Sequence, residues 1–341
     1  MRNYCSILLV SLIACHKPLS IQFEKFYEQI PELSPLDLSK PILLEISYVE
    51  DADYPKLTDA DLQRFLNRTQ ARAKDLLGVP VFFQLKKKIE AKDFFESEKS
   101  KFETAPFSFL SKEWHLDSDA ENFSADAGKI VRQQLQKVED KILKKYFPDT
   151  RLHREQIYQN ATEQFLKRLR AIQNEHDIQG NPIYQKNIPH KKYFQSYAHW
   201  DSILYQYADA DIILYNGLVA GADTEMPIYV IARGGVTSAF IENNLHRKYH
   251  GVGLVTLYPC FSRGSYFVSV RGVYSPSDSI ECAAHIFVHE LGHLLLHKEE
   301  NYTFEGSIHR APPDLDYMKW VNAIKLQKKM RSDEVGLLKK F

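Results

Sequence analysis

The chain has 341 residues, 44% of them hydrophobic and 26% charged, which is the composition of an ordinary folded protein. Its 44 basic and 44 acidic residues balance to a formal net charge of zero. A nucleic-acid-binding protein usually carries a basic excess, so we expect no nucleic-acid partner. The length suffices for one large domain or two smaller ones.

The first residues predict an export signal. Arg2 supplies a positive charge, and residues 7–13 form an apolar stretch that is too short to span a bilayer as a helix. We therefore expect residues 1–14 to be a signal peptide that is absent from the mature protein. An ordinary secretory signal, or a core strand, is the alternative to the more specific interpretation that follows.

The residues Leu12-Ile13-Ala14-Cys15 resemble the bacterial lipobox, at which a lipoprotein signal is cut just before a cysteine that becomes lipidated. This resemblance covers only four residues, and it implies that Cys15 is a lipid anchor. The mature protein would then be exported and held at a membrane, either the bacterial outer membrane or the cell surface. We expect residues 15–40, with three prolines and little periodicity, to be the lipidated N-terminus and a tether.

Two cysteines, Cys260 and Cys282, remain once Cys5 leaves with the signal and Cys15 is lipidated. The oxidising environment outside the cell allows this pair to form a disulfide. Two separate, buried thiols are the alternative.

The expected mature domain, residues 41–341, opens with a β-α-β pattern. Residues 42–49 predict a strand, and residues 79–85 predict a second one. Between them, Thr58 followed three residues later by Asp61 indicates the start of a helix, and Gly78 indicates its end. The two strands are expected to be parallel and joined by a right-handed crossover.

Residues 92 to about 207 are highly charged and predict a helical insertion in this domain. Two amphipathic helices are expected at 125–146 and 151–175, with Thr150 as the N-cap of the second. The insertion either packs beside the sheet or forms a lid, and a plain structural elaboration is the simpler interpretation. The lysines at 86–88 are interpreted as a solvated strand end.

Strands return after the insertion. They are predicted at residues 210–215, 228–232, 253–258 and 266–270. A largely apolar helix then follows, with Ser277 or Ser279 as its expected N-cap.

This last helix contains the pattern H-E-x-x-H at His289, Glu290 and His293. Residues four apart lie on the same face of a helix, so both imidazoles can bind one ion at about 2.0–2.1 Å, as Zn²⁺ prefers. Glu290 is placed to reach a water beside the ion and to act as a general base. Ionisable side chains in a buried helix are costly unless a metal or partners hold them. A core helix whose histidines bond to main-chain carbonyls is the alternative.

Strands followed by an H-E-x-x-H helix resemble the N-terminal subdomain of zincin metallopeptidases. The resemblance implies an α+β fold with a zincin-like mixed, twisted sheet, a backing helix and the H-E-x-x-H active-site helix, beside the insertion. It also implies a zinc-dependent endopeptidase that acts on a peptide or protein substrate, with Zn²⁺ as its cofactor. Members of this family bind substrate as an added strand next to the cleft. Residues 253–258 are our candidate for that strand.

The third zinc ligand is left open by the sequence. In the metzincin branch the pattern continues to a glycine and a third histidine, but these positions are Leu296 and Glu299 here. A histidine shortly before a methionine resembles the metzincin ending, which implies His309 as the third ligand with Met318 below the metal.

Other residues compete for these roles. Glu305, Glu299 and His297 are alternatives to His309 as ligand, while His285 is expected to pack or to support the ligands. Tyr317 is a candidate for stabilising the oxyanion, and an exposed turn tyrosine is the alternative.

Two other functions stay open. Residues 289–297 also resemble the active helix of cytosolic peptidases of phage-repressor and stress-regulator type. Those peptidases take a glutamate ligand from a second helix that we do not identify in this chain, and an export signal conflicts with a cytosolic role. The remaining alternative is a non-catalytic surface lipoprotein that keeps a zincin fold and binds a partner.

Overall fold

The computed structural model describes residues 40–104 and most of residues 153–326, together with isolated residues between 127 and 143. Its larger gaps lie between 196 and 208, at 223–229, at 240–250 and between 297 and 305. The expected signal peptide, Cys15 and the tether up to residue 39 lie outside the described residues. Among the helices of the described residues, none combines the length and the apolar character that crossing a bilayer requires.

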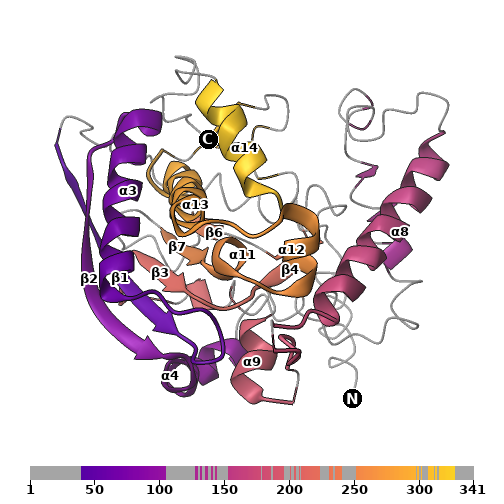
Figure 1. Cartoon of the computed structure of the whole chain (residues 1–341), viewed down its shortest axis with the longest axis horizontal. Coiled ribbons are helices and arrows are strands. Elements are labelled where there is room, and N and C mark those ends of the chain that lie inside the picture. Colours follow the sequence, from indigo (N-terminus) through magenta and orange to yellow (C-terminus); the bar gives the residue numbers. More distant parts are fainter. Residues whose placement is uncertain are drawn as a thin grey trace, which may run out of the picture.

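A mixed sheet lies at the centre of the domain (Figure 1). Its strands, in the order β2-β1-β3-β7-β6, are β2 (Val81–Glu90), β1 (Ile42–Glu50), β3 (Ile212–Tyr215), β7 (Gly251–Thr256) and β6 (Gly235–Ala239). The first four strands of this order are parallel, and β6 joins β7 in the antiparallel sense at one edge. A short antiparallel pair, β4 (Ala220–Ala222) and β5 (Val230–Ala232), forms a second sheet. The protein is therefore a mixed α/β domain with a four-stranded parallel core.

The β-α-β opening is confirmed. The helix α3 (Asp59–Leu77) connects β1 to β2, and these two strands are parallel. Its N-cap is Thr58, whose Oγ1 accepts a hydrogen bond from the main-chain N–H of Asp61 at 3.1 Å. At the other end Gly78 adopts φ = 70°, a left-handed conformation that glycine reaches without the clash of a Cβ.

Two helices cover one face of the sheet: α3 and the long helix α13 (Pro276–Leu296) lie against each other there (Figure 1). A stack of three aromatic rings joins them to the strands. Phe287 of α13 lies 5.9 Å from Phe65 of α3 and 4.9 Å from Phe83 of β2, between ring centroids. Stacked rings of this kind add to the burial of apolar surface that holds α13 in place.

The insertion packs onto the sheet. Its described helices are α4 (Ala91–Thr104), α8 (Arg154–Gln173) and α9 (Pro189–Phe194). Phe94 of α4 contacts Phe194 of α9 and the ring of Tyr207, and the Tyr207 hydroxyl donates to Ser47 Oγ of β1 at 2.8 Å. The second amphipathic helix is present but begins at Arg154 after the N-cap His153, and Thr150 lies outside the described residues.

Several other boundaries differ from the prediction. The helix α13 is capped by Ser275, whose Oγ accepts from the Asp278 N–H at 3.1 Å, and not by Ser277 or Ser279. The strand β2 continues through the three lysines to Glu90. These lysines stay in the strand because each finds a carboxylate: Lys86 pairs with Glu45, Lys87 with Asp209 and Lys88 with Glu50.

The segment 266–270, expected to be a strand, forms the helix α12 (Ser265–Arg271). Its aromatic and β-branched residues favour a strand, but Phe267 is its buried residue, and no strand of the described residues pairs with it. The carboxylate of Glu175 stabilises the helix instead, because it accepts the N–H of Tyr266 in the first turn at 2.9 Å. Tyr258, expected to end a strand, begins the short helix α11 (Tyr258–Phe261).

Candidate metal centre

The helix α13 brings His289 and His293 together as their spacing predicts. Both side chains project from one face, with ring centroids 4.5 Å apart and ring planes at 88°. Their Nε2 atoms are 3.1 Å apart. Two nitrogen ligands of one tetrahedral zinc ion would be about 3.3 Å apart, given zinc–nitrogen bonds of about 2.05 Å.

Main-chain carbonyls orient both imidazoles. The Nδ1 of His289 lies 2.7 Å from the carbonyl oxygen of Ile308, and the Nδ1 of His293 is hydrogen-bonded to the carbonyl oxygen of Lys298. A carbonyl can only accept, so Nδ1 of each ring carries the proton and donates it. The two Nε2 atoms then face each other across 3.1 Å, so a cation, either a proton or a metal ion, is favoured between them.

Glu290 lies beside this pair. Its Oε1 is 3.9 Å from the Nε2 of His289, and its side chain is buried. A carboxylate at this place borders the atoms that would bind the metal without replacing either of them. The position fits a group that takes a proton from a water next to the ion.

His309 approaches the pair from a loop outside the helix. The loop is held by two hydrogen bonds, from the Asn301 N–H to the His309 oxygen at 2.8 Å and from the His309 N–H to Ser307 Oγ at 3.1 Å. The imidazole is buried, and its centroid lies 6.3 Å from that of His293. Two imidazoles that hold one tetrahedral ion have centroids roughly 5 Å apart, so His309 would have to move about 1 Å closer to bind it.

Within the described residues, no three histidine, cysteine or carboxylate side chains converge closely enough to hold a metal. The described residues therefore supply two ligands with the spacing that zinc requires, His289 and His293, and His309 is a neighbour of this pair. The competing ligands His297, Glu299 and Glu305 lie outside the described residues.

Gly292 explains how His309 comes so near. A Cβ at position 292 would overlap Cε1 and Nδ1 of the His309 ring. The glycine inside the H-E-x-x-H pattern therefore leaves the space that this imidazole fills. Glycine inside a helix lowers its stability by about 1 kcal/mol relative to alanine. The close approach of the His309 ring explains why a glycine is nevertheless present at position 292.

The remaining candidate residues make other contacts in the structure. His285 is buried, its Nδ1 donates to the Glu281 carbonyl oxygen at 2.8 Å, and burial lowers its pKa to about 4. Tyr317 is buried and has Cys260, Tyr274 and Cys282 around it, so it is not an exposed turn residue. The main-chain N–H of Met318 donates to the Tyr274 hydroxyl at 3.0 Å, and its side chain packs against the core.

The expected disulfide is not formed. Cys260 of α11 and Cys282 of α13 are both free and buried. Burial raises the pKa of the Cys260 thiol to about 12, because the thiolate would lose its hydration, and it raises that of Cys282 as well. The alternative of two buried thiols describes the structure.

The strand expected to bind substrate is also corrected. Residues 251–256 form β7, which is paired on one side with β3 and on the other with β6, so it has no open edge for an added strand. The antiparallel strand β6 occupies the edge instead, and α13 packs against both β6 and β7. The strand β6 was not predicted, because its five residues, Gly235–Ala239, include a glycine and two other small residues and form no strong strand pattern.

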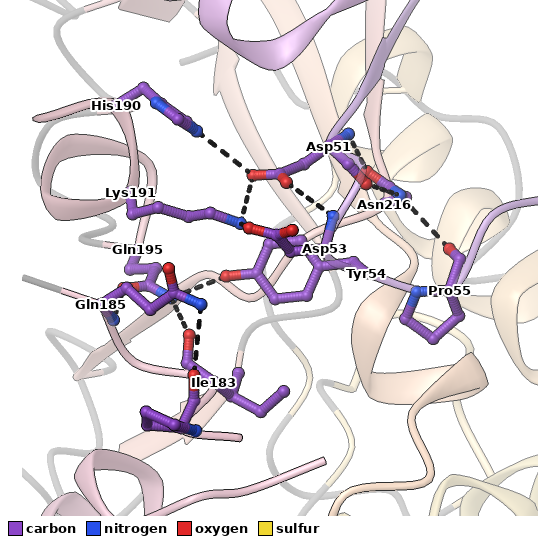
Figure 2. Close-up of polar contacts among 11 residues, drawn as sticks. Asp51, Asp53, Tyr54, Pro55, Ile183, Gln185, His190, Lys191, Gln195 and Asn216 are labelled. Carbon is purple, nitrogen blue, oxygen red and sulfur yellow. Dashed lines mark hydrogen bonds and ion pairs between the residues drawn. The ribbon is translucent and has the colours of Figure 1, made fainter. Parts of the chain in front are cut away.

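A second cluster of charged side chains lies at the carboxyl ends of β1 and β3 (Figure 2). The ammonium of Lys191, from α9, is buried and lies 2.6 Å from Asp51 Oδ2 and 3.1 Å from Asp53 Oδ2. It also lies 4.2 Å from the centroid of the Tyr54 ring. Asn216, directly after β3, accepts the Asp51 N–H and donates to the Asp51 carbonyl. The cluster joins the insertion to the ends of two strands, and the sequence provided no motif for it.

Comparisons with family models, with curated proteins and with solved structures found no match to this chain.

Proposed function

We propose that this chain is a zinc-dependent endopeptidase, with the residues of α13 as its catalytic centre. The observation that carries the proposal is the pair of Nε2 atoms 3.1 Å apart, on imidazoles whose Nδ1 atoms both donate to main-chain carbonyls. The distance between these two nitrogens is close to the separation of about 3.3 Å between two nitrogen ligands of one tetrahedral zinc ion. The same carbonyl support is common behind histidine ligands of metals.

The fold supports a zincin-like architecture. β6 is an antiparallel strand at the edge of the described sheet, and the histidine helix packs against β6 and β7, so this edge lies beside the proposed metal centre. We propose that an extended substrate lies along β6 and adds to the sheet through main-chain hydrogen bonds.

The proposed chemistry divides between the metal and Glu290. Bound zinc would supply a Lewis acid that polarises the peptide carbonyl and lowers the pKa of a neighbouring water. The Glu290 carboxylate takes a proton from the attacking water and then delivers it to the departing amine. His289 and His293 hold the metal, with His309 as the proposed third ligand and Glu299, Glu305 or His297 in its place otherwise.

The place of action is proposed from the sequence. Cleavage before Cys15 and lipidation of this residue would tether an exported enzyme to a membrane, where peptides or proteins outside the cell are its substrates.

The substitution Glu290→Gln tests the catalytic role. Gln keeps the size of the side chain but cannot accept the proton at the same step, so we expect unchanged zinc content and at least a 100-fold loss of peptide hydrolysis. Glu96→Gln, at an exposed position of α4, is the matched control and should retain full activity. Cleavage at the parent rate by Glu290→Gln would exclude the proposed base.

A non-catalytic, partner-binding lipoprotein is the second candidate. It is favoured by one observation, namely that two and not three imidazoles converge within the described residues. The parent protein distinguishes the two functions, because this alternative predicts no hydrolysis of a mixed peptide library at any zinc concentration.

A further inference from the structure

A tryptophan from the last described helix lies against the metal centre. The helix α14 (Tyr317–Leu326) is joined to α13 through Lys325, whose ammonium lies 3.1 Å from Glu281 Oε1. Its first turn is held by the Tyr274 hydroxyl, which accepts the Met318 N–H. Between these two attachments, Trp320 is 97% buried.

The indole of Trp320 packs between two histidines of α13. Its centroid lies 6.3 Å from that of His289 and 6.2 Å from that of His285, with ring planes at 84° and 75°. These near-perpendicular arrangements are favourable contacts between aromatic rings. Because His289 and His285 are one helical turn apart, one indole restricts both rings.

His289 then has two restraints of different kinds. The hydrogen bond from Nδ1 to the Ile308 carbonyl directs one edge of the ring. Whenever this hydrogen bond opens, the imidazole is free to rotate about its Cβ–Cγ bond. The indole packs against the ring and opposes this rotation. Metal ligands that are held in this way lose little freedom when they bind.

The contact does not depend on the indole N–H. Within the described part of the chain, Nε1 of Trp320 has no hydrogen-bond acceptor although it is buried. A phenylalanine could provide a similar planar ring without burying an unsatisfied donor. This separates the effect of the ring from that of the N–H in an experiment.

We propose that Trp320 is a positioning residue, whose indole holds the His289 imidazole in the orientation that binds zinc. The inference rests on the part of the proposed function that assigns zinc to His289 and His293. It predicts zinc affinity and not the rate of hydrolysis. Trp320 acts through His289 and is not itself a ligand.

The test compares zinc dissociation constants, measured by competition with a chromogenic chelator, for the parent, Trp320→Phe and Trp320→Leu. We expect Trp320→Leu, which lacks a planar ring, to bind zinc about 10 to 100 times more weakly, as is usual when a residue that supports a ligand is lost. Trp320→Phe should stay within about threefold of the parent. Val321→Ala removes two buried methyl groups from the same helix and is the control for a general loss of packing.

Denaturant unfolding is measured for each metal-free variant alongside its zinc dissociation constant. Only variants that are folded are then compared. A folded Trp320→Leu with the affinity of the parent overturns the inference, and so does an equal weakening by Val321→Ala. An equal loss in Trp320→Phe would assign the effect to the N–H and would also contradict it. A parent that binds zinc but hydrolyses no peptide refutes the proposed function alone, whereas a parent that binds no zinc refutes both.

Discussion

Single buried side chains in this protein have pKa values set by their surroundings. Glu175 has no exposed surface, and burial raises its pKa from 4.5 to about 7 even though its carboxylate accepts the N–H groups of the first turn of α12. Gly264 makes this burial possible, because a Cβ there would overlap Glu175 Oε1. The carboxyl group is therefore more easily protonated in the folded chain than in the unfolded chain.

This difference predicts how stability depends on pH. A raised folded-state pKa means that the folded chain binds the extra proton, so the stabilisation is complete below pH 4.5 and is lost as the pH rises through about 7. Glu175→Gln stays neutral and can still accept the Tyr266 N–H. We expect it to gain stability relative to the parent between pH 5 and pH 8, by on the order of 3 kcal/mol.

Urea unfolding of both proteins at the two pH values measures this gain. The difference between the unfolding free energies of variant and parent at each pH cancels the titration of every other group. Parallel dependence of parent and variant on pH would show that Glu175 has the same pKa in the folded and unfolded chains.

The geometry of the candidate metal centre was predictable from the sequence only in part. The spacing of His289, Glu290 and His293 on a helix was sufficient to bring their side chains together, because a helix has a fixed period. The main-chain carbonyls of Lys298 and Ile308 could not be predicted as partners, because every residue has a main-chain carbonyl and the sequence does not mark these two. The contact of Trp320 with His289 depends on how two helices cross, which the amphipathic spacing of α14 does not specify.

At the scale of elements, α9 is attached to β1 by a buried ion pair. Lys191 and Asp51 are both more than 95% buried, and their charged atoms are 2.6 Å apart (Figure 2). Removing one member of such a pair leaves an uncompensated charge in the interior, which typically costs about 3–5 kcal/mol.

We therefore expect Lys191→Met to lower the free energy of unfolding by about 3 kcal/mol or more. The double variant Asp51→Asn with Lys191→Met should recover part of the loss, because it buries no unpaired charge. Lys86→Met is the control, since its partner Glu45 is at the surface and the pair should contribute less than about 1 kcal/mol. Additive losses in the double variant would mean that the two groups are not coupled.

Elements with local start and stop signals were predicted well. Thr58 and Gly78 define α3 through contacts with their own neighbours, and β1 and β2 follow from their apolar residues. The segment 266–270 was predicted wrongly because its conformation depends on Glu175, almost a hundred residues earlier in the chain. The strand β6 exists through its pairing with β7 and not through its own residues.

For the whole molecule, the histidine helix and the insertion are attached to different parts of the sheet. The helix α13 with its histidines crosses the face formed by β6 and β7, while the insertion is attached at the carboxyl ends of β1 and β3 (Figure 1, Figure 2). A lid over the histidines was one expectation for the insertion. Its described contacts with β1, through Tyr207 and Lys191, favour a structural elaboration of the domain.

The most direct test of the central claim is the zinc content of the purified mature chain, measured by mass spectrometry of the metal for the parent, His293→Ala and His153→Ala. His153 is exposed at the start of α8 and should leave the metal centre unchanged. We expect one zinc per chain in the parent and in His153→Ala, and almost none in His293→Ala. A parent without zinc after metal has been added, or a His293→Ala variant that keeps its zinc, would contradict the metal centre on α13.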